Sequence, residues 1–155
     1  RFLSRCEGNR ARMKLGFFYL IMGYGVPSVF YGDECYIEGI EEPDYRQKMP
    51  WLKEDNAYEL FKEWIAIRNR HSAVRNGDYV TLLTRDAEGI YAFARVNDED
   101  EVVVVINNSG EDYVFDSDDL DEICRRLETW SGKSHGLDMP ERIDGYGYIV
   151  IERFY

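Results

Sequence analysis

The sequence predicts a mixed α+β fold in which part of a parallel α/β barrel precedes an antiparallel β-sandwich. Apolar residues recur at helical spacing up to about residue 71. A short apolar run, residues 28–31, ends in Gly-Asp-Glu, as a buried barrel strand does where it opens onto an active-site face. Beyond residue 78 the apolar residues alternate with polar ones, which is typical of strands. These patterns indicate a helix–strand–helix segment followed by an all-β segment.

The first helix is expected from Asn9 to about Tyr24. Asn9 can cap its start, and Gly23 and Gly25 can end it. Apolar side chains cover most of its circumference, so both sides should pack against other parts of the protein; they are Met13, Phe17, Phe18, Leu20, Ile21 and Met22. The run that follows, residues 28–31, is then expected to be a central parallel strand.

A long loop and a second helix follow. Residues 33–55 carry Gly39, two prolines and many acids, and loops of that length in compact domains are usually functional or disordered. The second helix is expected over residues 56–71, where apolar residues recur at three- and four-residue spacing. They are Leu60, Phe61, Trp64, Ile65 and Ile67.

The second half is expected to contain at least six strands. Their ranges are 79–84, 90–96, 101–107, 113–115, 127–131 and 148–154. Turns rich in Asp, Asn and Gly separate the first four. Such a set predicts a small antiparallel sandwich, with the boundary between the two parts near residues 74–78.

Composition excludes several classes of protein. Of the 155 residues, 45% are hydrophobic and 15% are aromatic, which excludes a disordered chain. The net charge of -11 repels phosphate and anionic lipid, so nucleic acid and membrane surfaces are poor partners, whereas a neutral sugar is compatible. The uncharged run from Leu15 to Gly32 is interrupted by Gly23, Gly25 and Pro27, which favours a buried helix and strand over a membrane span.

No metal site is expected. The acidic run 116–122 fails the EF-hand pattern, because Leu120 and Asp121 occupy the wrong positions, and it reads as a solvated turn. His71 and His135 have no partner at ligand spacing. The three cysteines form no spaced pair, so reduced thiols in a cytoplasmic protein are the simplest interpretation.

Three stretches carry a family resemblance. They are Arg1-Phe2-Leu3, the segment Arg12-Met13-Lys14-Leu15, and the run from Gly25 to Glu34. They resemble the alpha-amylase superfamily of glycoside hydrolases. A loop of its neopullulanase and cyclomaltodextrinase branch is similar to the continuation Glu42-Pro43-Asp44-Tyr45-Arg46-Gln47-Lys48-Met49-Pro50-Trp51. The resemblance covers nearly the whole chain and is strongest over residues 1–51.

The resemblance implies a fold and an activity. Members have a (β/α)8 barrel followed by an antiparallel β-sandwich called domain C. By that match the chain is an α+β fragment, with the last helix–strand–helix part of the catalytic barrel over residues 1–77 and domain C over residues 78–155. The chain begins at Arg1 rather than Met, which agrees with the C-terminal portion of a larger enzyme.

The implied reaction of the parent enzyme is retaining hydrolysis of α-1,4 or α-1,6 glucosidic bonds. This reaction needs two carboxyls about 5 Å apart. In the family these carboxyls, and a third in an Asn-His-Asp motif, lie upstream of the matched stretch. We therefore expect no catalytic residue and no cofactor in this chain, and no activity of the isolated chain.

Arg46 is the residue most expected to bind substrate. The resemblance implies that this Arg, with an acid four residues earlier, reaches sugar subsites in the parent enzyme. A guanidinium presents five donors in a fixed fork that suits vicinal hydroxyls. The acid is Glu42 where Asp is commoner, and Asp44 could take its place.

Neighbouring residues of the loop have structural alternatives. Asp33 and Glu34 point to opposite sides of an extended strand, so they are expected to brace the loop rather than to act as an acid–base pair. Tyr31 and Trp51 could stack on sugar faces, with core packing as the alternative.

Two other functions stay open. Exposed apolar surface would favour a non-catalytic module that binds carbohydrate or docks another domain. A transferase or sucrose isomerase of the same superfamily is a further alternative. The expected partner of the parent enzyme is an α-glucan or maltooligosaccharide. Cut from its neighbours, the first helix would lose part of its cover, so this half should aggregate or form a homodimer.

Overall fold

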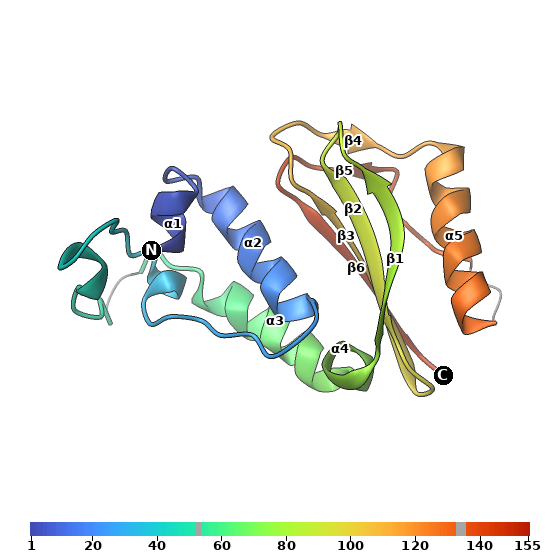
Figure 1. Cartoon of the computed structure of the whole chain (residues 1–155), viewed down its shortest axis with the longest axis horizontal. Helices are drawn as coiled ribbons and strands as arrows, with labels where there is room; N and C mark the ends of the chain where they lie inside the picture. Colours follow the sequence, from blue (N-terminus) through green and yellow to red (C-terminus); the bar gives the residue numbers. More distant parts are fainter. Residues whose placement is uncertain (52–53, 133–135) are drawn as a thin grey trace.

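An antiparallel sheet separates two layers of helices in the computed structural model, which describes residues 1–51, 54–132 and 136–155 (Figure 1). The first layer contains α1 (Phe2–Arg5), α2 (Arg10–Met22), the short 3-10 helices η1 (Asp33–Cys35) and η2 (Asp44–Arg46), α3 (Tyr58–Arg70) and α4 (Ser72–Asn76). The second part contains β1 (Asp78–Arg85), β2 (Ile90–Val96), β3 (Asp100–Asn107), β4 (Tyr113–Val114), α5 (Ser117–Ser131), β5 (Arg142–Ile143) and β6 (Tyr148–Phe154).

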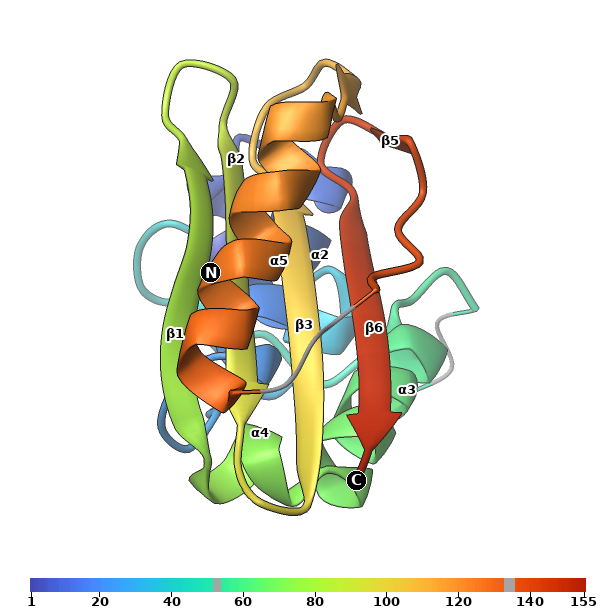
Figure 2. The same ribbon diagram turned by 90° about the vertical axis from the view of Figure 1, so that its right-hand side faces the viewer.

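The main sheet has the strand order β1-β2-β3-β6, and every neighbouring pair is antiparallel. Helix α5 lies across one face, and α2, α3 and α4 lie behind the other (Figure 2). Successive side chains of a strand point to opposite faces. Val102 and Val104 therefore pack against the first helical layer, while Val103 and Val105 pack under α5. Two covered faces explain why β3 is apolar along most of its length.

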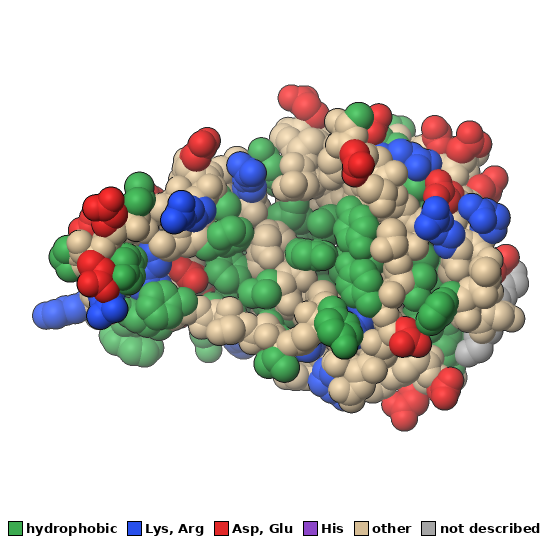
Figure 3. Space-filling model, viewed as in Figure 1, with side chains coloured by type: hydrophobic (Ala, Val, Ile, Leu, Met, Phe, Trp, Pro, Cys, Tyr) green, Lys and Arg blue, Asp and Glu red, His purple; other side chains and the backbone are tan. Residues whose placement is uncertain are grey.

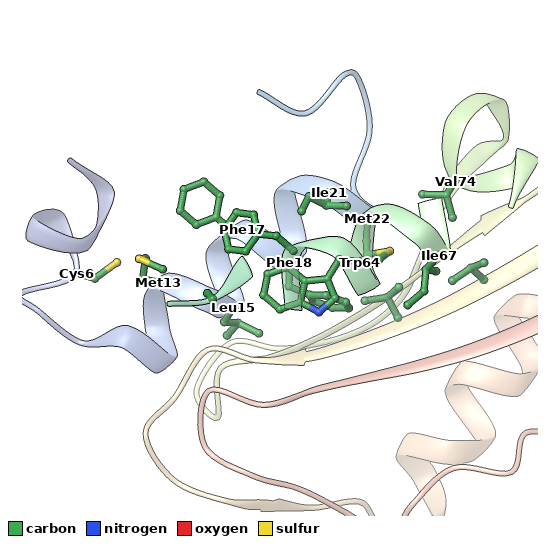
Figure 4. Packing of buried hydrophobic residues seen from close by; sticks show 14 of the residues in the cluster. Cys6, Met13, Leu15, Phe17, Phe18, Ile21, Met22, Trp64, Ile67 and Val74 are labelled. Atoms are coloured by element: carbon green, nitrogen blue, oxygen red, sulfur yellow. The ribbon is translucent and has the colours of Figure 1, made fainter. Parts of the chain in front are cut away.

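Aromatic side chains join the first helical layer to the sheet (Figure 4). Phe18 of α2 stacks on Tyr148 of β6, with ring centroids 3.9 Å apart. Trp64 of α3 is fully buried beside this pair, edge-on to both rings, and donates a hydrogen bond from Nε1 to the Tyr148 hydroxyl at 3.0 Å. Asn9 caps α2 by accepting from the Arg12 backbone N–H at 3.0 Å, as its sequence position predicts.

Two buried arginines hold the C-terminal end of α2. Arg68 donates to the carbonyl of Ile21 at 2.7 Å, and Arg95 of β2 donates to the carbonyl of Gly23 at 2.7 Å. Arg95 also donates to the carbonyl of Gly77 at 2.8 Å. Burial lowers the pKa of both guanidinium groups. Repulsion by a second arginine lowers each pKa further: Arg75 acts on Arg68, and Arg68 acts on Arg95. The orphan carbonyls at this helix end are thus satisfied by side chains from α3 and the sheet.

Residues 28–31 do not form the expected strand. They belong to an irregular segment, residues 24–31, that runs back past α3 after α2 (Figure 1). Among the described residues, no backbone N–H from 24 to 31 donates a hydrogen bond. Val26 and Phe30 are 93% and 49% exposed, so water solvates this backbone. A strand needs a neighbour for its ladder, and none of the described residues supplies one here.

The expected strand 127–131 is also wrong, because it forms the end of α5. Asp116 caps this helix in a reciprocal capping box with Asp119, so the acidic run 116–122 starts a helix rather than forming a solvated turn. Leu120, Ile123 and Leu127 lie on one helical face and pack on the sheet. The second layer expected of a sandwich is therefore a helix, with β4 and β5 as a small separate sheet.

The remaining elements confirm the sequence patterns. The expected helices appear as α2 and α3, and the alternating segments appear as β1, β2, β3, β4 and β6. The sequence patterns did not indicate the two residues of β5 or the short helices α1 and α4. No helix among the described residues is both long and apolar enough to cross a membrane.

Candidate functional site

The acidic loop that follows Gly32 folds on itself through two short 3-10 helices. Gly32 adopts a left-handed conformation with φ 84° at the start of η1. A Cβ at this position would lie 2.2 Å from the Ile37 side chain, so no other residue fits without displacement. Gln47 of the returning arm donates from Nε2 to the Glu38 carbonyl at 2.9 Å. The loop therefore has a defined shape that presents η2 at its tip.

Arg46 pairs with Glu42 at this tip. Arg46 Nη2 lies 2.6 Å from Glu42 Oε1, and the two side chains are 66% and 56% exposed. The Tyr45 hydroxyl donates to the same Glu42 oxygen at 2.7 Å. Asp44 is exposed on η2, and within the described ranges no ion pair joins it to Arg46. The acid four residues before Arg46 is thus its partner, despite the longer side chain of Glu.

Asp33 lies beneath the loop rather than on its surface. It is 7% exposed, and its Oδ1 lies 3.5 Å from Arg1 Nη1. Burial raises the pKa of Asp33, and the nearby Arg1 guanidinium partly opposes that rise. The Glu34 carbonyl accepts from the Ala57 backbone N–H at 2.7 Å and so ties η1 to the start of α3. Both contacts fit the expected bracing role of this dipeptide.

The two aromatic candidates lie on the surface. Tyr31 is 42% exposed and donates from its hydroxyl to the Gln47 carbonyl at 3.1 Å. Trp51 is 83% exposed and lines a cavity of about 640 Å³ between the loop and the start of α3. Core packing, the alternative expected for both, is wrong for Trp51. An open indole face beside a cavity can instead accept the apolar side of a ligand.

Acidic and histidine side chains form no metal-binding cluster in the described part of the chain. His71 is instead buried beside two carboxylates, with Nε2 2.6 Å from Glu152 Oε2 and Nδ1 3.4 Å from Asp100 Oδ2. Arg70 also pairs with Glu152, at 2.5 Å. His135 lies outside the described residues. The sequence patterns did not indicate the His71 cluster, because the two carboxylates lie about 30 and 80 positions away from His71.

The sequence patterns also did not single out a group of tyrosines that lie between α2 and the sheet. Tyr79 and Tyr91 share a hydrogen bond between their hydroxyls at 3.0 Å, and Tyr19 of α2 lies with its ring edge toward Tyr91. Burial raises the pKa of Tyr79, and its hydrogen bonds with Tyr91 and Tyr19 raise it further. Strands β1 and β2 carry one tyrosine each, and the strand pattern does not reveal which helix faces these side chains.

Comparison with known proteins gives a consistent picture. No family model matches the chain. The chain is 36% identical over 114 residues to neopullulanase 2 of Thermoactinomyces vulgaris, a match that covers 72% of the chain and 20% of that enzyme. It is 32% identical over 114 residues to a cyclomaltodextrinase of Geobacillus thermopakistaniensis, covering 72% of the chain and 19% of that enzyme. The chain thus spans about a fifth of the length of these relatives.

Solved structures of similar enzymes match the chain as well. A cyclomaltodextrinase structure, 29% identical, matches with a TM-score of 0.66 over 74% of this chain and 20% of its own. Cyclic alpha-maltosyl-(1→6)-maltose hydrolase from Arthrobacter globiformis, in complex with that sugar, matches the fold with a TM-score of 0.76 at 23% identity. This match covers 99% of the chain and 32% of that enzyme.

The loop, the sheet and these matches define the class: the chain is homologous to enzymes of the alpha-amylase family. Within that family its relatives are the neopullulanases and cyclomaltodextrinases, which it matches over about 70% of its length. The expected resemblance is confirmed at this level.

Proposed function

We propose that the chain is the C-terminal portion of an α-glucan-acting glycoside hydrolase, of the neopullulanase or cyclomaltodextrinase kind. The parent enzyme hydrolyses α-1,4 or α-1,6 glucosidic bonds with retention, through carboxylates outside this chain. The observation that carries the proposal is the 36% identity with neopullulanase 2 over 114 residues. Residues 1–77 then belong to the barrel and residues 78–155 to domain C.

The segment 24–31 supports the barrel assignment. Its backbone N–H groups donate no hydrogen bond within the described residues, and Val26 is 93% exposed. An apolar segment with free backbone donors is suited to pair with strands on either side. In the parent enzyme those strands come from the rest of the barrel.

Arg46 is the proposed sugar-binding residue of the loop, with Glu42 and Asp44 beside it. Glu42 pairs with the Arg46 guanidinium group, and the Tyr45 hydroxyl holds the Glu42 carboxylate by a hydrogen bond. The Arg46 side chain is still 66% exposed, so the guanidinium donors that do not face Glu42 can reach a ligand. A fork of donors in one plane matches a pair of neighbouring hydroxyls better than a single ammonium would.

The activity is tested by comparing the 155-residue chain with the longer reading frame that contains it. Both are assayed on maltotriose, cyclodextrin and pullulan with a reducing-sugar readout. We expect turnover by the longer product and none by the isolated chain. Clear turnover by the isolated chain would contradict the proposed place of the carboxylates, and an inactive longer product would contradict the hydrolase.

The role of Arg46 is tested in the longer enzyme with Arg46→Ala. Loss of a charged hydrogen-bond donor should lower kcat/KM by about tenfold or more. Arg126→Ala is a matched control, because Arg126 forms an exposed i,i+4 pair with Glu122 at 2.9 Å on α5. An equal loss in both variants, or none in Arg46→Ala, would assign Arg46 a structural role only.

A second candidate is a non-catalytic module that binds carbohydrate or docks another domain. The exposed apolar side chains of Tyr24, Val26 and Trp51 favour it. It predicts sugar binding or complex formation without turnover, even by the longest product of the gene.

A further inference from the structure

His71 lies at the joint between the two halves of the molecule, as the single residue between α3 and α4. It is fully buried, and its ring stacks on Phe154 at the end of β6, with centroids 4.5 Å apart. Two carboxylates flank the ring: Glu152 Oε2 lies 2.6 Å from Nε2, and Asp100 Oδ2 lies 3.4 Å from Nδ1. Nδ1 makes no hydrogen bond within the described residues. The proposed hydrolase activity makes no use of this buried titratable group.

The two carboxylates belong to the sheet and are held in place by the helical half. Many acidic side chains project from the surface (Figure 3), whereas Asp100 of β3 is 3% exposed. It accepts from the backbone N–H groups of Ser72 at 2.9 Å and Ala73 at 2.7 Å, and so caps the start of α4. Glu152 of β6 accepts from Arg70 Nε at 3.0 Å. Neither carboxylate can therefore turn away from the imidazole ring without losing a bond to α3 or α4.

Neither neutral form of the ring suits this site. A neutral imidazole has one N–H donor and one nitrogen with a lone pair. With the proton on Nε2, the lone pair of Nδ1 lies 3.4 Å from a carboxylate oxygen of Asp100. With the proton on Nδ1, the lone pair of Nε2 lies 2.6 Å from a carboxylate oxygen of Glu152. Because the ring is fully buried, bulk water does not screen either repulsion, and only the imidazolium ion presents an N–H to both carboxylates.

The charges around the ring support the same form. Charged side chains face this joint from each element packed around it: Arg70 of α3, Arg75 of α4, Glu99 and Asp100 where β3 begins, and Glu152 of β6. Arg75 donates to backbone carbonyls at the end of α3, and Glu99 is exposed. One cation and two carboxylates remain beside the ring, so an imidazolium ion cancels the excess negative charge. Burial raises the pKa of Glu152, but its bonds with Arg70 and His71 lower it below the ordinary value, as a cationic ring would.

We propose that His71 is held as an imidazolium ion and that its proton locks the helical half to the sheet. The ring then directs one N–H to Glu152 of β6 and the other toward Asp100 of β3, so a single proton couples the α3–α4 junction to both strands. Loss of that proton at alkaline pH sets a lone pair against a carboxylate and weakens the joint. This lock lies wholly within the chain and does not depend on the activity of the parent enzyme.

The protonation state of His71 is measured by NMR on the 155-residue chain labelled with 15N in histidine. The chain has two histidines, so His135→Gln leaves the ring signals of His71 alone. We expect both ring nitrogens of His71 to carry protons at about pH 7.5, where an exposed histidine is mostly neutral. A neutral ring at this pH would overturn the proposal.

Glu152→Gln tests whether the carboxylates hold the proton. This variant removes one negative charge next to Nε2, so the pH at which the ring loses its proton should fall by about one unit or more. Glu88→Gln, in the exposed β1–β2 turn, is the matched control and should leave that pH unchanged. The same titration in Glu152→Gln as in the parent chain would overturn the proposal.

The lock is measured from the backbone amide signals of Ser72 and Ala73, which bond to Asp100. Both signals should shift at the pH where the His71 ring loses its proton, and this shift should be absent in His71→Gln. The amide of Ala94, inside β2, is the control signal and should not follow the ring. Amides of Ser72 and Ala73 that stay still while the ring titrates, or that shift equally in His71→Gln, would show that the proton of His71 does not lock the joint.

Discussion

The two halves of the molecule cover their apolar surface to different extents. In the sheet half, residues 78–155, strands β2 and β3 are buried on both faces between helices (Figure 2). The helical half, residues 1–77, is covered only on the side that meets the sheet. Its other side exposes Tyr24, Val26 and Ile40 at 82%, 93% and 73%. The sheet half thus has its apolar surface covered as in a complete domain, whereas the helical half has one uncovered side.

This difference indicates a one-way dependence. The core of the helical half includes Phe93, Val102 and Val104, which are sheet residues. The core under α5 consists of sheet residues and α5 itself, with few neighbours from elsewhere. We therefore expect the helical half to lose its order when its contact with the sheet is damaged, while the sheet keeps most of its own.

The largest effect is expected for Trp64→Ala. Trp64 is fully buried and bonds to Tyr148 across the boundary, so its loss leaves a cavity and an unpaired hydroxyl. Such truncations cost about 3–5 kcal/mol. Urea unfolding measures the change, and Trp130→Ala on the exposed face of α5 is the control. Amide exchange should then speed up in α2 and α3 before it does in β2 and β3. Equal loss of protection in both halves would contradict the one-way dependence.

Arg95→Met should have the second-largest effect. It removes the hydrogen bonds to the carbonyls of Gly23 and Gly77 and leaves those groups buried without partners. We expect a loss of about 2–3 kcal/mol in the free energy of unfolding. Arg95→Lys keeps the charge but not the fork, so it should recover only part of the loss. Full stability of Arg95→Met would show that the boundary depends on apolar packing alone.

A smaller effect is expected for Gly32→Ala, which tests the helical half by itself. Its φ of 84° is unfavourable for alanine, and the new Cβ would lie 2.2 Å from the Ile37 side chain. Together these should cost about 2 kcal/mol. Gly25→Ala is the matched control, because its φ is 94° but nothing lies within 4 Å of the added Cβ. Equal costs for the two variants would mean that the clash is relieved by movement of Ile37.

The smallest effect is expected for Glu152→Gln, measured as a function of pH. Burial acts to raise the pKa of Glu152, but hydrogen bonds from Arg70 and His71 outweigh it and lower the pKa below 4.5. The unfolded chain therefore binds this proton more tightly. The stability that the carboxylate adds is present above about pH 4.5 and is lost as pH falls through the lowered pKa.

Glu152→Gln should thus lose about 1 kcal/mol at neutral pH and show a flatter acid limb. Glu88→Gln in the exposed β1–β2 turn is the control and should unfold as the parent does. An unchanged acid limb in Glu152→Gln would place the acid sensitivity on other carboxylates.

Sequence patterns predicted the elements whose apolar residues are spaced as a helix or a buried strand requires. The helix around Trp64 and Ile67 buries the face that its spacing reveals, and the apolar run around Val102 is a strand buried on both faces. The same reasoning could have found α5, since Leu120, Ile123 and Leu127 repeat at helical spacing after a capping acid. The expectation of a strand over residues 127–131 was wrong, because it considered the last turns of α5 apart from the capped first turn.

Other features could not be read from the sequence. Whether residues 28–31 form a strand depends on partners, and the described residues provide none. An acid four residues before Arg46 was expected from the family resemblance, and Glu42 at that position pairs with Arg46. The contacts of Arg68 and Arg95 could not be expected, because their acceptors are backbone carbonyls 17 to 72 positions away. A side chain that bonds to a backbone carbonyl has no complementary side chain in the sequence that would indicate its partner.

The hold of Arg68 and Arg95 on the end of α2 has a mechanical consequence. The chain leaves α2 at Gly23, and everything from there to the acidic loop extends from that point. Because a strand of the sheet fixes that point, the sheet sets the origin and direction from which the loop is projected. The far end of the segment is tied to the start of α3 through the Glu34 carbonyl, so the sheet and α3 together determine where Arg46 lies.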